Sequence, residues 1–379
     1  MNTHMGKIIL SALSLTALLG TPAATAQNIK PESRAAAAAD GGNNTVKITP
    51  IGQRTGEYCA RDRALLFEDP NGIRILYDPG VTVTGGGDSR LGEVHAILVS
   101  HSHFDHLGYR RLTQNPDDPQ SPCDDTLQTT RTGNTTTAEI AAFKNSAMLV
   151  NGSMTAFLSR KIQNILGVPA DGCPSSGVGR FGDNETVVPL SSPCTLTAAF
   201  GSLVIFTHAA GAPGVRINTV AALHSDSLFN PLVLLPADSL GKVLDDNGLQ
   251  GYDGLANGFV LTFTNGLKVY LTGDTGPTSD MAFVVRGIYH PNLTVANMDS
   301  LNNMGPEEAA YAMKELVRTA AVIPSHAEQA VTLNGKLIPG TRTAEFIRLL
   351  GDIPAYLPLS GRTMEFDSEA HCISGCGQN

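Results

Sequence analysis

The stretch His-Ser-His-Phe-Asp-His, at positions 101 to 106, constrains this chain more than any other feature. It follows an apolar run at 96 to 99, typical of a buried strand, and precedes Leu-Gly, so we expect it in a loop at the strand's end. Two histidines one residue apart point the same way in an extended segment, while the aspartate and histidine beyond them can turn to a second ion. Imidazole and carboxylate suit zinc. The stretch therefore predicts a metal site with the ligands His101, His103, Asp105 and His106.

These four residues match the signature of the metallo-β-lactamase superfamily, which the chain resembles here. The resemblance implies an α/β fold, namely an αββα sandwich in which one or two metal ions lie between two β-sheets. It also implies a hydrolase, because most members of that superfamily are hydrolases. The remaining ligands must then come from other parts of the chain.

Three later β-rich runs each end in a residue that could complete the site: His224, Asp274 and His326. A sandwich of two sheets can bring distant strand ends to one edge, so these side chains can meet the metal-binding stretch. His208 ends another run in the same region and is the alternative to His224. We favour His224 because the run from Asn218 to Leu223, which leads into His-Ser-Asp, fits the family pattern better.

The order of the motifs sharpens the resemblance. The metal-binding stretch is followed by a lone histidine, then by Tyr-Leu-Thr-Gly-Asp-Thr-Gly, Met-Gly-Pro-Glu-Glu-Ala-Ala and Ile-Pro-Ser-His. This order is similar to that of the ascorbate-6-phosphate lactonase-like branch and of N-acyl-phosphatidylethanolamine phospholipase D, and the match runs from about residue 46 to 366. The resemblance implies one metal held by His101, His103 and His224, a second held by Asp105, His106 and His326, and Asp274 as a bridge.

Two Zn²⁺ ions per chain are the expected cofactor, although manganese or iron accept the same ligands. Because zinc lowers the pKa of bound water, we expect a hydroxide that bridges the two metals to attack the substrate. Asp105 is the expected catalytic residue, which orients the nucleophile and passes its proton to the leaving group. The resemblance favours an ester or lactone substrate. A phosphodiester or a β-lactam is the alternative, and a non-catalytic metal-binding protein is the alternative of another class.

The first 26 residues contain a lysine, an apolar stretch from Ile8 to Leu19 and an Ala-Thr-Ala end, which is the pattern of a cleaved signal peptide. The apolar stretch is too short to span a bilayer, so we expect a periplasmic or secreted protein with no stable membrane anchor. The net charge of −9 argues against nucleic acid as a partner and leaves a small-molecule substrate. Nothing in the sequence indicates an oligomeric state.

The six cysteines all follow this segment, and in an oxidising compartment they suggest up to three disulfides. We expect Cys173 to pair with Cys194 and Cys372 to pair with Cys376.

We expect the rest of the chain to form one catalytic domain at 46–368. A flexible linker at 27–45 precedes this domain, and a cysteine-containing tail at 369–379 follows it. Polar insertions lie near 110–143 and 227–257. We expect strands at 46–51, 147–151, 195–200, 203–207, 215–223 and 320–323, hairpins at 65–77 and 259–271, and helices at 153–166 and 307–318. Ser153 is the expected cap of the first helix and Pro306 begins the second. Asp78 is expected to be a structural turn former near the site.

Overall fold

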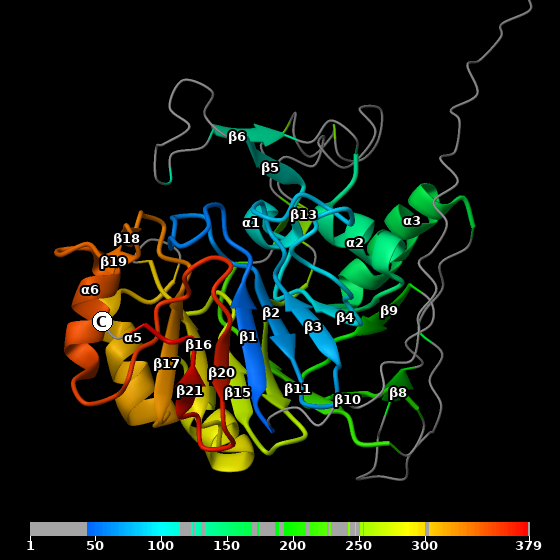
Figure 1. The fold of residues 1–379 in the computed structure, drawn as a ribbon. Coiled ribbons are helices and arrows are strands. Elements are labelled where there is room, and N and C mark those ends of the chain that lie inside the picture. The colour runs from blue at the N-terminus through cyan, green and yellow to red at the C-terminus, as the bar shows by residue number, and fades with distance from the viewer. Residues whose placement is uncertain are drawn as a thin grey trace, which may run out of the picture.

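The computed structural model describes residues 44–113, 123, 126–129, 133–168, 173, 186–188, 193–209, 212–225, 227–228, 242, 247, 251–252, 254–299 and 303–377. The expected signal peptide and nearly all of the expected linker lie outside these residues. Figure 1 shows two β-sheets packed face to face, with helices over the outer side of each. The expected αββα sandwich is confirmed.

The first sheet has eight strands within the described residues. Their order is β21 (Cys372–Ser374), β20 (Met364–Phe366), β1 (Val46–Pro50), β2 (Leu65–Glu68), β3 (Arg74–Tyr77), β4 (Ala96–Leu98), β7 (Ala147–Val150) and β9 (Cys194–Thr197). Strands β2 and β3 form the expected antiparallel hairpin, and β3, β4, β7 and β9 run parallel. Strand β21 pairs with β20, so the cysteine-containing tail extends this sheet.

The second sheet has seven strands in the part of the chain that is described. Their order is β17 (Ala321–Ser325), β16 (Leu293–Asn297), β15 (Lys268–Leu271), β14 (Asn257–Thr262), β11 (Val215–Ala221), β10 (Leu203–Phe206) and β8 (Thr186–Val188). Strands β14 and β15 form the second expected hairpin, whereas β15, β16 and β17 run parallel. Parallel strands end at one edge of a sheet, which places the residues after β15 and β17 near each other.

The core lies between the sheets and continues under the helices. Because successive side chains of a strand face opposite sides, Ile75 and Tyr77 of β3 join the cluster between the sheets, while Leu76 joins the cluster under the helices. The ring of Phe67 in β2 stacks on that of Phe263, which directly follows β14 of the opposite sheet, with their centroids 6.0 Å apart. Apolar burial on both faces therefore fixes the register of the central strands.

Helices α2 (Thr136–Lys144) and α3 (Gly152–Leu166) cover the first sheet. The second sheet is covered by η2 (Met281–Tyr289), α5 (Pro306–Tyr311), η3 (Ala312–Val317) and α6 (Arg342–Leu350). The helix expected at 307–318 begins at Pro306 and continues from α5 into η3, which is a π-helix. Short strand pairs join β5 (Arg110–Thr113) to β6 (Thr126–Thr129), β12 (Ser227–Leu228) to β13 (Gly251–Tyr252), and β18 (Thr332–Leu333) to β19 (Lys336–Leu337).

The expected cap of α3 was wrong. The side chain of Asn151, not that of Ser153, accepts a hydrogen bond from the backbone N–H of Met154 at 3.1 Å. The helix begins one residue earlier than its apolar spacing indicated, so the residue that precedes the glycine takes the capping position. Among the residues described, no helix is long and apolar enough to cross a membrane.

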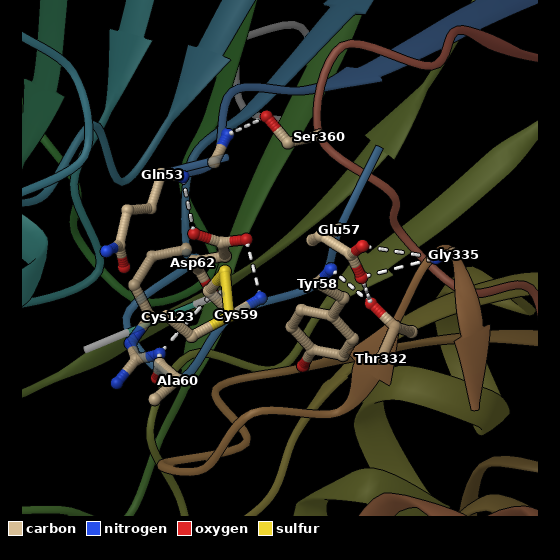
Figure 2. Close-up of a disulfide and its surroundings, with 12 residues drawn as sticks. Gln53, Glu57, Tyr58, Cys59, Ala60, Asp62, Cys123, Thr332, Gly335 and Ser360 are labelled. Carbon is tan, nitrogen blue, oxygen red and sulfur yellow. Dashed lines mark hydrogen bonds between the residues drawn. A yellow bond between two sulfur atoms is a disulfide. The ribbon is translucent and has the colours of Figure 1, made fainter. Parts of the chain in front are cut away.

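Three disulfides tie the described chain together. Cys173 pairs with Cys194 and Cys372 with Cys376, as expected, and Cys59 pairs with Cys123. Figure 2 shows the third pair beside Asp62, whose carboxylate accepts hydrogen bonds from the backbone N–H groups of Gln53 and Cys59. This disulfide links the segment between β1 and β2 to Cys123, which lies between β5 and β6 in the sequence.

Candidate metal centre

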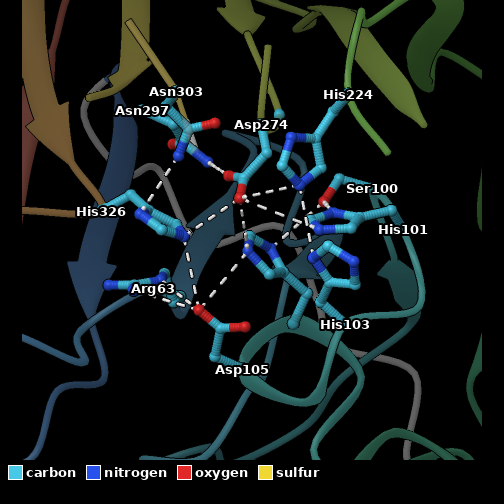
Figure 3. Close-up of polar contacts among 12 residues, drawn as sticks. Arg63, Ser100, His101, His103, Asp105, His224, Asp274, Asn297, Asn303 and His326 are labelled. Carbon is cyan, nitrogen blue, oxygen red and sulfur yellow. Dashed lines mark hydrogen bonds and ion pairs between the residues drawn. The ribbon is translucent and has the colours of Figure 1, made fainter. Parts of the chain in front are cut away.

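The ends of four strands meet at one edge of the sandwich. The chain leaves β4 into His101, β15 into Asp274 and β17 into His326, and His224 follows β11. The loop after β4 turns into α1 (Phe104–Leu107), a single helical turn. Figure 3 shows that the side chains from these segments point towards one another.

Two glycines let α1 pack against the end of β3. Gly108 ends α1 in the left-handed region with φ of 78°, and Gly80 has φ of 56°. The backbone N–H of Gly80 donates to the carbonyl of His106 at 3.0 Å. A Cβ on Gly80 would lie 2.1 Å from the carbonyl oxygen of Asp105, so only glycine allows this approach.

All seven metal ligands predicted from the sequence lie close together at this edge, and we call them the cluster. Their potential ligand atoms form overlapping groups, each within 4.8 Å: His101, His103 and His224; His101, His106 and Asp274; Asp105, His106 and His326. The carboxylate oxygen Oδ2 of Asp274 lies between these groups. It is 3.1 Å from Nε2 of His326, 3.4 Å from that of His106, and 3.8 Å from those of His101 and His224.

His208 lies elsewhere. Its side chain is exposed, its Nε2 lies 3.1 Å from the backbone oxygen of Asn71, and its ring packs edge-on against His95. The structure therefore brings His224 to the cluster and places its alternative against the turn between β2 and β3. His326 has a positive φ of 60°, and such strained non-glycine residues concentrate at functional sites.

The orientation of His101 and His106 fits a metal. Ser100 Oγ donates its proton to Asp78 at 2.7 Å, so it can only accept from Nδ1 of His101, which lies at 3.0 Å. Nδ1 of His106 donates to Asp78 at 2.8 Å. Both rings therefore direct an unprotonated Nε2 into the cluster when neutral. Nε2 of His101 has no hydrogen-bond partner among the described residues, as expected of an atom that would bind a cation.

The electrostatics of the cluster also suit cations. Burial, followed by the charges of neighbouring histidines, lowers the pKa of His101 well below its usual value and that of His103 to about 4. Burial alone would lower the pKa of His106 as well, but Asp274, Asp78 and Asp105 raise it to about 10. His101 and His103 thus stay neutral, while the carboxylates around His106 favour a positive charge on their side of the cluster.

Several residues that support the cluster escaped the sequence analysis. Arg63 pairs with Asp105 at 3.1 Å, and Asn297 donates to Oδ1 of Asp274 at 2.9 Å. Nδ1 of His326 lies 3.4 Å from Asp299 and 3.2 Å from Asn303. Asp299 follows β16, whose end lies between those of β15 and β17, so the strand-end reasoning that found Asp274 could also have found Asp299.

A cavity of about 410 Å³ opens onto the cluster. It is lined by Arg61, His103, Phe104, Asp105, Arg110, Ser225, Asp274, His326 and Glu328. The volume suits a small molecule, and the potential metal ligands occupy part of its wall.

No family model matches the chain. A UPF0173 metal-dependent hydrolase from Polaromonas sp. is 29% identical over 311 residues, which are 80% of this chain and 86% of that protein. Another from Cupriavidus necator is 28% identical over 272 residues, 70% of this chain and 71% of that protein. A solved metallo hydrolase from the archaeon Ignicoccus hospitalis has the same fold, with a TM-score of 0.50, 20% identity, and coverage of 85% of this chain and 99% of that one. Taken with the sandwich and its histidine and carboxylate cluster, these likenesses indicate a metal-dependent hydrolase with the metallo-β-lactamase fold.

Proposed function

We propose that this chain is an exported hydrolase that holds two metal ions, zinc foremost, and cleaves an ester or lactone. The observation that carries the two-metal part is the position of Asp274, whose Oδ2 lies within 3.8 Å of Nε2 atoms of four histidines. A single carboxylate oxygen among so many imidazoles suits a ligand that two cations share.

In this proposal His101, His103 and His224 would hold one metal, Asp105, His106 and His326 would hold the other, and Asp274 would be shared between them. When bound, the metals supply a water of lowered pKa and a Lewis acid for the developing oxyanion. All six cysteines are in disulfides, so the ligands are nitrogen and carboxylate oxygen, which suit zinc and also manganese or iron.

Asp105 is the proposed proton carrier. Burial raises the pKa of its carboxyl, but His106, His326 and Arg63 together hold it well below the usual range. Asp105 is therefore a carboxylate at neutral pH, and it lines the cavity. A carboxylate in that place can accept a proton from the attacking water and return it to the leaving group.

The substrate class and the export rest on separate support. The motif order resembles the lactonase-like branch, which favours an ester or lactone by analogy. Three disulfides are typical of a protein that folds in an oxidising compartment, which favours export.

A panel of lactones, esters, phosphodiesters and β-lactams tests the reaction. The purified mature protein is assayed on each with and without a strong chelator, then with zinc restored, and its metal content is counted. We expect turnover of esters or lactones that the chelator abolishes and zinc restores, with two metals per chain. Turnover confined to phosphodiesters or β-lactams would overturn the substrate class. No turnover with two metals bound would favour the non-catalytic alternative. Mass spectrometry of the protein from the cell envelope tests export, since the mature chain should begin near Gln27.

A further inference from the structure

Two guanidinium groups share one aromatic ring in the wall of the cavity. Arg61 and Arg110 lie over the ring of Phe104, with Cζ 5.9 Å and 4.7 Å from its centroid. Phe104 stands between His103 and Asp105 in the sequence, and all five of these residues line the cavity. Cationic side chains stacked on an aromatic ring are held in place, with their N–H groups at the edge of the stack available to bind a ligand.

The charge of Arg61 is already compensated. Its Nη1 donates to both carboxylate oxygens of Glu328, at 2.8 Å and 2.6 Å. Glu328 also pairs with Arg63, which in turn pairs with Asp105. The positive charges of these two arginines balance the negative charges of the two carboxylates, so this group of four side chains carries no net charge.

Arg110 differs from Arg61 in this respect. Its Nε is buried and has no hydrogen-bond partner within the described parts of the chain. Among the described residues no carboxylate pairs with Arg110, whereas Arg61, the other arginine that lines the cavity, pairs with Glu328. A buried N–H donor left without an acceptor is costly, and an acceptor that arrives with a ligand removes that cost.

We propose that Arg110 binds an oxyanion of the substrate, a carboxylate or a phosphate, against the edge of the Phe104 ring. The planar fork of a guanidinium matches the two oxygens of such a group, and the resulting charge-assisted hydrogen bonds are strong. The proposal rests on the proposed hydrolase site and deepens it, because it states that the ester or lactone carries an anionic group. Arg110 would then select the substrate and take no part in the bond cleavage.

Calorimetric titration of the purified, metal-loaded protein with benzoate, phenylphosphonate and neutral benzamide tests the proposal without any turnover. The variants are Arg110→Gln, Arg110→Lys and, as a matched control, Arg348→Gln, which removes an exposed arginine paired with Glu345 on α6. We expect Arg110→Gln to weaken the binding of an anion by about 10- to 100-fold and to leave benzamide unchanged. Arg110→Lys should fall in between, because it keeps the charge without the fork. Arg348→Gln should match the wild type.

The outcomes separate clearly. A loss confined to phenylphosphonate assigns the subsite to a phosphate, a loss confined to benzoate assigns it to a carboxylate, and both results support the proposal. Equal anion affinity in Arg110→Gln and wild type would overturn it, as would a wild type that binds neither anion more tightly than benzamide. Unchanged benzamide binding shows that the variant is folded. A protein that binds anions through Arg110 but hydrolyses nothing would refute the proposed function and leave this inference standing.

Discussion

Arg63 and Asp105 form a buried ion pair in which Nη2 and Nε of the arginine lie 3.1 Å and 3.3 Å from Oδ2 of the aspartate. The guanidinium also donates to Glu328 and, at 2.9 Å, to the backbone oxygen of Ala60. Nearly all donors of Arg63 therefore have partners, which a charge removed from water requires. The pair connects the segment before β2 to α1, so Arg63 positions the aspartate that we propose as proton carrier.

Replacing Arg63 by methionine should lower the free energy of unfolding by about 3–5 kcal/mol, because the change leaves the buried carboxylate of Asp105 without its arginine. Urea denaturation with a fixed slope measures the loss. Arg348→Gln is the control, since its exposed ion pair with Glu345 should contribute less than about 1 kcal/mol. Equal losses in both variants would contradict the importance of the buried pair.

Replacing Asp105 by asparagine should reduce kcat by about 10²- to 10⁴-fold and change KM little, because the amide keeps the shape and an oxygen but cannot accept the proton. Steady-state kinetics give both constants on whichever substrate is found, and the metal content is measured on the same sample. Near-normal turnover with two metals bound would refute the role of Asp105. Loss of a metal would show instead that its ligand role dominates.

The local part of this site could be predicted from the sequence. The spacing from His101 to His106 is a property of six neighbouring residues, and Asp274 and His326 each follow an apolar run that could only be a strand. The two hairpins were also predictable, because Asn-Gly turns separate their strands. The cap of α3 was missed because asparagine and serine are both good caps and lie two residues apart.

The supporting residues could not be predicted in the same way. Arg63 and Glu328 are 265 positions apart and meet only because both sheets are complete. The residues around Arg63 show no hydrophobic periodicity. Arg63 matters to the site because it is buried beside Asp105, and the spacing of residues in the sequence does not reveal burial. The same holds for the pairing of Cys59 with Cys123, since six cysteines allow fifteen connectivities and neither partner lies in a recognisable motif.

The buried carboxyl of Asp62 should make stability depend on pH. Burial raises its pKa from 3.8 to about 6, although N–H groups from Cys59 and Gln53 and the charge of Arg63 lower it. Between about pH 4 and 6 the folded protein therefore holds a proton that the unfolded chain has lost. Folding binds a proton in this window, so the contribution of Asp62 to the free energy of unfolding falls as pH rises and stays low above pH 6.

Urea unfolding of the wild type and Asp62→Asn at pH 4, 5, 6 and 7 measures this effect. The free energy of unfolding of the wild type minus that of Asp62→Asn should fall by roughly 2–3 kcal/mol from pH 4 to 7. Asp88→Asn is the control. Burial raises the pKa of Asp88, but Arg90 and backbone N–H groups lower it to about 2. The free energy of unfolding of the wild type minus that of Asp88→Asn should therefore stay nearly constant above about pH 4. Parallel curves for wild type and Asp62→Asn would show that this carboxyl does not titrate in the window.

The disulfides should differ in what they contribute to stability. Cys59 and Cys123 are 64 residues apart, whereas Cys372 and Cys376 are 4 apart. Because a cross-link restricts the unfolded chain more when it closes a longer loop, replacing the first pair by serines should cost about 4 kcal/mol in urea unfolding. Replacing the second pair should lower the free energy of unfolding by about 2 kcal/mol less than replacing the first pair does. The first replacement should also release the segment that carries Arg61 and Arg63, so KM should rise in that variant alone. Equal losses of stability together with an unchanged KM would mean that the fold holds this segment without the covalent link.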